Sequence, residues 1–173
     1  QNTETFFQIK IGDDKSKIFY FENSSLKFEQ DFNFGLNIII KDVSKITSLK
    51  VNTVKEIIEK IKIENNFLND EMVEKHLFIE DSFRKIKKKL IFEIALARIQ
   101  EISQIMLAKN INLGHYTKYC NKLFLEITSE LKTESLINIF KNSFFEDSKI
   151  EVKILNNLTS EDMLKTANEV VHF

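Results

Sequence analysis

The chain has 173 residues, of which 43% are hydrophobic, enough for one folded domain or two small subdomains and too many for a disordered chain. With 25 basic and 26 acidic side chains the net charge is −1, which gives no electrostatic reason to expect nucleic acid or an anionic membrane as the main partner. A single cysteine, Cys120, excludes an internal disulfide and a cysteine-based zinc cluster, and no apolar run approaches the roughly 20 residues that span a bilayer.

The beginning of the sequence predicts β-strands. Segments 6–11 and 18–22 are rich in β-branched and aromatic residues, and the polar stretch 12–17 between them has the composition of a hairpin turn. Segment 26–32 alternates apolar and polar side chains, which predicts a third strand.

Apolar residues at helical spacing predict three helices in the middle of the chain: 36–44, about 52–63 and about 81–109. For the second helix, Asn52 or Thr53 is available as a cap, and Glu56 three residues after Thr53 completes a capping-box pattern. The third helix carries apolar residues on more than one side, as expected of a helix with several neighbours. Between these two helices, residues 76–79 have the composition of a short strand.

The end of the chain alternates strand and helix. Segments 123–127 and 150–155 predict strands, and segments 133–145 and 160–171 predict helices. The chain thus begins with strands, continues with a mostly helical part and ends with a β-α-β-α tail. This order is expected of an α/β subdomain interrupted by a helical one.

Four short motifs spread over nearly the whole chain resemble motifs of FtsA, a bacterial homologue of actin. Residues 9–18 (IKIGDDKSKI) are similar to the strand-turn-strand of its second phosphate loop, and residues 35–43 (GLNIIIKDV) to its glycine-led segment ending in Asp-Ile. Residues 58–62 (IEKIK) resemble its Ala-Glu-x-x-Lys stretch beside adenosine, and residues 97–102 (ARIQEI) the Ala-Arg-x-x-Glu-Ile core of a long helix. No single motif is specific, so the resemblance depends on their order and spacing.

This resemblance implies an α/β chain with the actin-like, ribonuclease H-like fold, of which it would be the second half. Residues 1–50 together with 115–173 would form the sheet-containing subdomain, and residues 51–114 the inserted, mainly helical subdomain. The first half of the fold, and the membrane-targeting helix that follows Phe173 in family members, would lie outside this chain.

The resemblance also implies a nucleotide site. The residues at its positions are Gly12, Ser16, Gly35, Glu59, Lys62, Thr128 and Ser129. Lys10 stands where the family has the aspartate that serves Mg²⁺ through water. Asp13 and Asp14 replace residues that face phosphate, and two carboxylates there would repel a triphosphate by on the order of 1 kcal/mol per charge pair. The sequence Thr-Ser-Glu at 128–130 replaces the glycine pair that admits the base and ribose.

We therefore expect a degenerate ATPase that binds ATP and Mg²⁺ weakly or not at all. We expect no catalytic residue and no resident metal. Lys15 and Lys17 offset part of the repulsion, so an active actin-like ATPase stays open as an alternative. On the plainer interpretation, residues 12–17 are a polar hairpin, and Glu59 and Lys62 are ordinary residues of a helix surface.

The remaining polar residues favour structural roles. Three histidines lack a metal-ligating partner at short spacing: His76, His115 and His172. Arg98 lies inside an apolar helix, where we expect it to pair with Asp42 or Glu101. Cys120 is expected to be buried and inert, and the lysines of 82–89 are expected to be solvated rather than to contact a membrane.

The function that the resemblance implies is that of a cell-division scaffold. In FtsA the helical subdomain receives the C-terminal tail of the tubulin-like protein FtsZ, and the whole protein tethers that polymer to the membrane. The chain would then be cytoplasmic, at the inner face of the cell membrane, and would reach the membrane through a segment outside the chain. Head-to-tail self-association into filaments is also implied, whereas no nucleic acid is expected.

Two further alternatives stay open. The first is an actin-fold scaffold of pilus or secretion machinery, similar to PilM or the cytoplasmic part of GspL, which uses the fold without nucleotide. The second is that the resemblance is accidental and the chain is a helical interaction domain, in which case no strand pair would form at residues 6–22.

Overall fold

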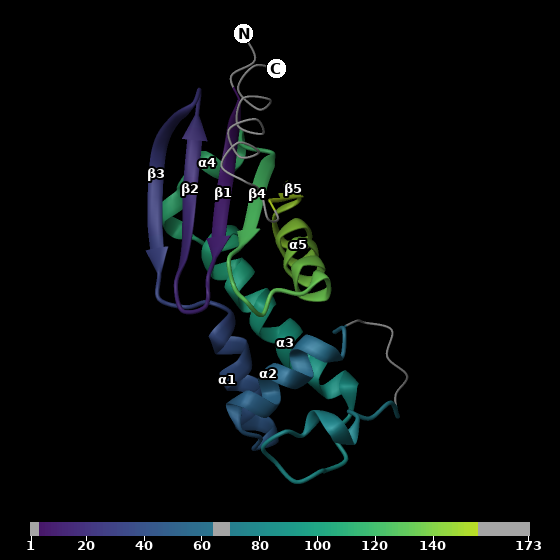
Figure 1. Ribbon diagram of the computed structural model, residues 1–173. Coiled ribbons are helices and arrows are strands. Elements are labelled where there is room, and N and C mark those ends of the chain that lie inside the picture. Colours follow the sequence, from purple (N-terminus) through teal and green to yellow (C-terminus); the bar gives the residue numbers. More distant parts are fainter. Residues whose placement is uncertain (1–3, 64–69, 156–173) are drawn as a thin grey trace.

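The computed structural model describes residues 4–63 and 70–155 (Figure 1). These residues form a five-stranded sheet with the order β3-β2-β1-β4-β5. The strands are β1 (Thr5–Ile11), β2 (Ser16–Glu22), β3 (Ser25–Phe32), β4 (Lys122–Ile127) and β5 (Glu151–Ile154). The first three strands pair antiparallel, whereas β4 is parallel to β1 and β5 is parallel to β4. The strands predicted at 6–11, 18–22, 26–32, 123–127 and 150–155 and the hairpin turn at 12–17 are confirmed.

In Figure 1 the helices lie behind, beside and below this sheet, with α4 behind it. They are α1 (Leu36–Thr47), α2 (Val51–Lys60), α3 (Lys88–Ser103), α4 (Tyr116–Tyr119) and α5 (Glu134–Ser148). Shorter turns are the 3-10 turns η1 (Lys75–Leu77) and η3 (Ile111–Leu113) and the π-helical turn η2 (Gln104–Ala108), which continues α3. In Figure 1, α5 lies beside the sheet, α1 and α2 form a helical part below it, and α3 runs from this part towards the sheet.

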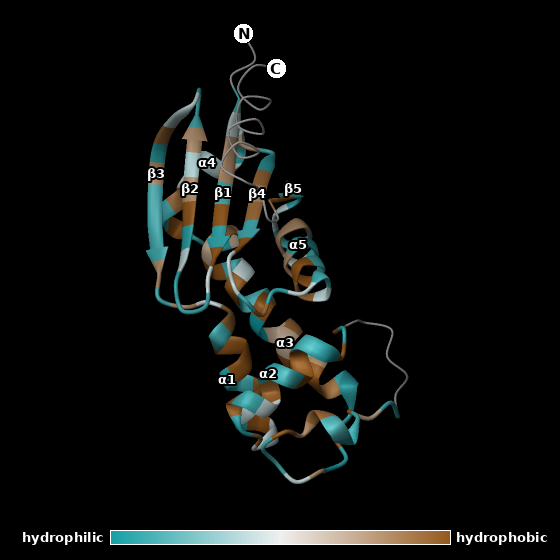
Figure 2. Cartoon of the chain, viewed as in Figure 1, coloured by the Kyte–Doolittle hydropathy of each residue, from teal (hydrophilic) through white to brown (hydrophobic). Residues whose placement is uncertain are grey.

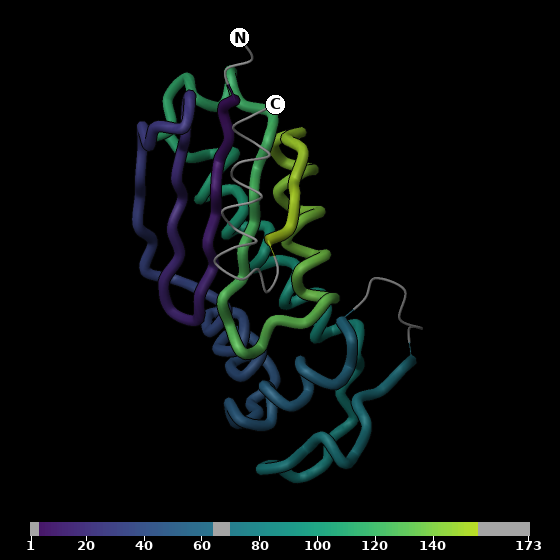
Figure 3. The backbone as a smooth tube through the Cα atoms, turned by 45° about the horizontal axis from the view of Figure 1, so that its top comes forward, coloured from purple at the N-terminus to yellow at the C-terminus, as the bar shows by residue number. Residues whose placement is uncertain are grey.

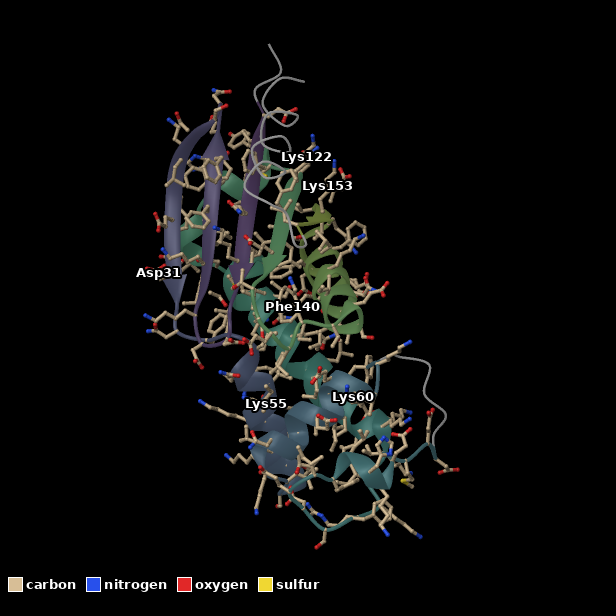
Figure 4. The ribbon with its side chains drawn as sticks, in the orientation of Figure 1. Asp31, Lys55, Lys60, Lys122, Phe140 and Lys153 are labelled. Atoms are coloured by element: carbon tan, nitrogen blue, oxygen red, sulfur yellow. The ribbon has the colours of Figure 1, made fainter. Side chains whose placement is uncertain are left out.

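Side chains from both parts form the core. Alternate residues of β1 and β4 are fully or almost fully buried: Phe7, Ile9, Ile11, Leu123, Leu125 and Ile127. The alternation of apolar and polar residues along these strands is visible in Figure 2. On α5, Phe140 is fully buried (Figure 4), and α3 has buried residues on more than one side, as predicted.

The predicted start of the third helix was wrong. The pattern placed it at Asp81 or Ser82, but α3 begins at Lys88. Just before it, the N–H of Val73 donates to the carbonyl of Ile86 at 2.8 Å, and Met72 pairs with Lys87 in an isolated antiparallel bridge. Pairing with residues far along the chain thus takes up backbone groups that a longer helix would have used.

Two predictions around α2 were also wrong. The helix begins at Val51, and its N-cap residue is Lys50 instead of Asn52 or Thr53. Thr53 is buried, and its hydroxyl accepts a hydrogen bond from the N–H of Glu80 at 3.1 Å, which is a tertiary contact and not a cap. Residues 75–77 form a 3-10 turn where a short strand at 76–79 was allowed.

Two sequence predictions are not decided by these residues. The helix expected at 160–171 lies outside the described residues. The division into residues 1–50 with 115–173 and residues 51–114 stays a prediction.

Candidate functional site

Three segments that contain predicted site residues meet at one end of the sheet. They are the β1–β2 turn, the start of α1 and the loop that follows β4 (Figures 1 and 3). Because β1 and β4 are parallel neighbours, with Ile11 opposite Ile127, both strands end at the same edge. The fold therefore brings Gly12, Gly35, Thr128 and Ser129 together.

Gly35 lies against the backbone of the β1–β2 turn. A Cβ atom built on Gly35 would lie 2.2 Å from the carbonyl oxygen of Gly12 and 2.5 Å from that of Asp13. The next two N–H groups, of Leu36 and Asn37, donate to these same carbonyl oxygens at 2.9 Å each. The turn thus caps the first turn of α1, whose N–H groups have no partner within the helix.

The carboxylates of the turn also have donors within the protein. The hydroxyl of Ser129, a residue only 3% exposed, donates to the Asp13 carboxylate. The side-chain amide of Asn37 donates to the Asp14 carboxylate at 3.0 Å. Ser129 Oγ in turn accepts from the N–H of Leu131 at 3.1 Å. These bonds fasten the β1–β2 turn to α1 on one side and to the loop after β4 on the other.

Gly12, Thr128 and Ser16 make contacts within the fold. The N–H of Gly12 donates to the carbonyl of Lys15 at 2.9 Å, and that of Thr128 to the carbonyl of Ile11 at 2.8 Å. A Cβ atom on Gly12 would lie 2.9 Å from the Lys15 oxygen. Ser16 is 2% exposed, and its hydroxyl donates to the carbonyl of Phe34 at 2.8 Å, so this hydroxyl faces the interior.

Lys10 occupies the position where the FtsA-like motif has an aspartate that serves Mg²⁺. Its ammonium lies 4.0 Å from a carboxylate oxygen of Glu126, the residue opposite it on β4, and 5.7 Å from the centre of the Phe19 ring. Within residues 4–63 and 70–155, no group of three or more His, Cys, Asp or Glu side chains is placed to hold a metal ion.

Glu59 and Lys62 lie at a second place, a groove of about 690 Å³ between α3 and α5. Glu59 comes from the end of α2 and Lys62 from the segment after it, α3 contributes Phe92 and Leu96, and α5 contributes a polar face. The loop after β4 leads from Ser129 to Thr133, the N-cap residue of α5, which also lines the groove. The predicted site residues therefore fall in two places joined by one loop.

The pairing of Arg98 was predicted from the sequence, whereas the roles of Asn37 and of the polar face of α5 were not. Arg98 pairs with Asp42 through Nε and a terminal nitrogen, at 2.5 and 3.0 Å, and with Glu101 at 2.8 Å, which confirms the predicted pairing. The bound Asp42 raises the pKa of Arg98 above its usual value. Sequence reasoning missed Asn37 and the groove face of α5, because polar residues on a helix give the same signal as a solvated surface.

Cys120 is buried as predicted, and burial raises the pKa of its thiol. A thiol whose pKa is raised is less reactive, because the thiolate is the nucleophile. At the end of α5, Phe144 is fully buried and Phe145 is 48% exposed. None of the helices in the described part of the chain is long and apolar enough to cross a membrane.

The fold is that of the actin-like proteins. No family model and no curated protein matches the sequence. Solved structures do match: MreB5 of Spiroplasma citri bound to AMPPNP has 14% identity and a TM-score of 0.62 over 98% of this chain and 54% of that chain. The archaeal actin homologue Ta0583 has 13% identity and a TM-score of 0.56 over 98% of this chain and 49% of that one.

A third match is the PilM–PilN type IV pilus biogenesis complex, with 9% identity and a TM-score of 0.53 over 97% of this chain and 44% of that chain. The chain thus spans about half the length of the structures it matches. The expected actin-like fold is confirmed, although these neighbours do not point to FtsA in particular.

Proposed function

We propose that this chain is half of an actin-like scaffold that works by holding partner proteins and not by hydrolysing ATP. The observation that carries the proposal is the set of internal bonds at the β1–β2 turn. Its carbonyls cap α1, and its two carboxylates, of Asp13 and Asp14, accept from Ser129 and Asn37.

A triphosphate with Mg²⁺ does not fit these residues. A phosphate loop works by turning backbone N–H groups towards the anion, and carboxylates in the same turn oppose this. The position that would serve Mg²⁺ carries an ammonium, that of Lys10, which faces Glu126. Our proposal is therefore that ATP binds weakly or not at all and that the chain has no ATPase chemistry.

The partner that we propose is the C-terminal tail of FtsZ, as the FtsA-like motifs imply. The chain would then belong to a cytoplasmic scaffold that tethers the division ring to the membrane through a segment outside this chain. Self-association into head-to-tail filaments is part of the same proposal. The helical part around α2 and α3 would receive the tail, as an extended or amphipathic peptide commonly enters a helical groove.

The first alternative is an actin-fold scaffold of pilus or secretion machinery, and the match to the PilM–PilN complex favours it. The second is a working ATPase, favoured by the match to MreB5 with AMPPNP. For that alternative, Lys17 gives little help, because its ammonium is bound by Glu29 at 3.0 Å and by Asp31 at 3.3 Å. Lys15, which is exposed at the turn, is the cation that remains for a phosphate.

The test is a calorimetric titration of the intact protein with the FtsZ tail peptide from the same organism. We expect saturable binding in the micromolar range, about −8 kcal/mol, and none with a scrambled peptide of the same composition. If the folded protein shows no binding up to about millimolar peptide, the division partner is wrong. A short cytoplasmic peptide from a pilus or secretion inner-membrane protein is then the partner to titrate.

A further inference from the structure

The groove between α3 and α5 follows most of the length of α5. Its lining residues on α5 run from Glu134 to Glu146, which is more than three helical turns, or about 18 Å at 1.5 Å per residue. An extended peptide covers that length with about five or six residues at roughly 3.3 Å each. The groove therefore has the length of a short peptide segment.

The chemistry of the lining also fits a peptide. The floor is apolar, with Phe92 and Leu96 from α3 and Ile139 from α5. The rim has exposed amide side chains, among them Asn138 and Asn142. An amide carries both donors and acceptors, so a row of amides can bond the N–H and C=O groups of an extended backbone. Side chains of the peptide would then alternate between the floor and the solvent.

The charges around the groove are mostly negative. The residues that line the groove include three exposed carboxylates, of Glu59, Glu134 and Glu146, and one exposed ammonium, that of Lys62. Glu134 and Glu146 lie near opposite ends of α5, and Glu59 comes from the end of α2. A segment with positive charges on both sides of an apolar centre would be attracted to this arrangement, and an acidic segment would be repelled.

We propose that this groove binds an extended segment of a partner protein in which Lys or Arg residues flank one or two large apolar side chains. The inference rests on the proposed function, in that the chain recruits its partner through a peptide. Beyond that function, it names the groove between α3 and α5 as the binding surface and a positive charge as the property of the bound segment. The acidic rim sets the preference for basic flanking residues, and the apolar floor holds the central side chain.

The experiment is a selection from a random seven-residue peptide library on the intact protein, followed by fluorescence-anisotropy titration of the most enriched synthetic peptide. We expect Lys or Arg to be enriched on both sides of an apolar position. The triple variant E59Q/E134Q/E146Q should bind that peptide about tenfold more weakly, because each exposed charge pair contributes modestly and three are lost together. Raising the salt concentration should weaken binding of the wild type more than that of the triple variant.

Two further variants separate the groove from the rest of the surface. N142W places a large side chain in the groove at an exposed position and should weaken binding without loss of folding, measured by circular dichroism. E130Q removes an exposed carboxylate from the loop after β4, outside the groove lining, and should leave affinity unchanged. Enrichment of neutral or acidic peptides, or affinity that N142W and the triple variant leave unchanged, would overturn the inference.

This result is independent of the FtsZ titration. If basic peptides bind in the groove and the FtsZ tail does not bind the protein, the proposed partner is wrong and the groove inference holds. If the FtsZ tail binds with an affinity that the triple variant and N142W leave unchanged, recruitment holds and the groove is not its site.

Discussion

Gly35 lies where the backbone of α1 approaches the β1–β2 turn most closely, so this position has no room for a side chain. A Cβ atom there would meet the carbonyl oxygen of Gly12 at 2.2 Å, and backbone cannot swing away as a flexible side chain can. We predict that G35A lowers the free energy of unfolding by about 2 to 3 kcal/mol, the usual cost of overpacking. Urea denaturation followed by circular dichroism measures it.

Gly114 is the matched control for this substitution. Its φ is +54°, but a Cβ atom there would have no atom within 4 Å. G114A should therefore show only the cost of its strained backbone conformation, φ +54° with ψ −123°, which is about 1 to 3 kcal/mol. If G35A leaves the free energy of unfolding within about 0.5 kcal/mol of the wild type, the close approach at the turn is not as the structure shows it.

Arg98 joins α3 to α1 through a two-point contact with Asp42. Lysine has one ammonium in place of the planar guanidinium, so R98K keeps the charge but loses the fork geometry. We predict that R98K lowers the free energy of unfolding by about 1 kcal/mol, since both side chains are partly exposed and solvent screens them. The exposed Arg84 is the control, because R84K should change stability by less than half of that amount.

Lys88 makes stability depend on pH. Its ammonium contacts Glu74 at 2.6 Å and Glu71 at 3.0 Å, and the hydrogen bond from Lys88 lowers the pKa of Glu74 below its ordinary value of 4.5. The stabilisation is therefore present above about pH 4.5 and is lost as the pH falls through the lower pKa of the folded state. Because Glu74 is nearly half exposed, the effect is small, about 0.5 to 1 kcal/mol.

The variant E74Q tests this dependence. Its free energy of unfolding should lie below that of the wild type at pH 7, and the difference should shrink towards zero near pH 3. E93Q changes an exposed glutamate of α3 and should match the wild type at both pH values. A difference for E74Q of equal size at pH 7 and pH 3 would mean that the carboxylate of Glu74 is not the stabilising group.

At the scale of elements, local patterns predicted most of the strands and helices. The β-branched and aromatic residues of β1 and β2 and the alternation in β3 are local features that a sequence shows directly. The start of α3 could not be predicted, because Phe83 and Ile86 continue its apolar stripe although Ile86 and Lys87 pair with residues 72 and 73. Thr53 misled for the same reason, since its hydroxyl bonds to the N–H of Glu80, 27 residues away.

The side chain of Ser129 joins the loop after β4 to the β1–β2 turn. Ser129 donates to Asp13 and accepts from Leu131, so S129A removes both bonds and leaves the Asp13 carboxylate without this donor. We predict faster amide hydrogen exchange at residues 13–15 and 128–131, with a local loss of about 1 kcal/mol. S25A, at an exposed serine of β3, should leave these amides unchanged. Unchanged exchange in S129A would show that backbone contacts alone hold the loop.

At the scale of the whole molecule, the sequence predicted the actin-like fold but only part of the candidate site. Gly12, Gly35 and Ser129 meet because they lie at strand ends and at a helix start, where the fold determines position. The sequence did not predict that these residues bond to one another, nor that Glu59 and Lys62 would line a separate long groove. Such contacts depend on how distant segments face each other, and local spacing carries no information about that.

The most direct test of the account is calorimetric titration of the intact protein with MgATP. The carbonyl groups of the β1–β2 turn and the Asp13 carboxylate are bonded within the protein, and Lys10 replaces the carboxylate that would serve Mg²⁺. We therefore predict no saturable binding of MgATP below about 1 mM, so that its binding free energy is weaker than about −4 kcal/mol. Micromolar binding that is lost in the charge reversal K15E would contradict the account, because the β1–β2 turn would then be a working phosphate loop.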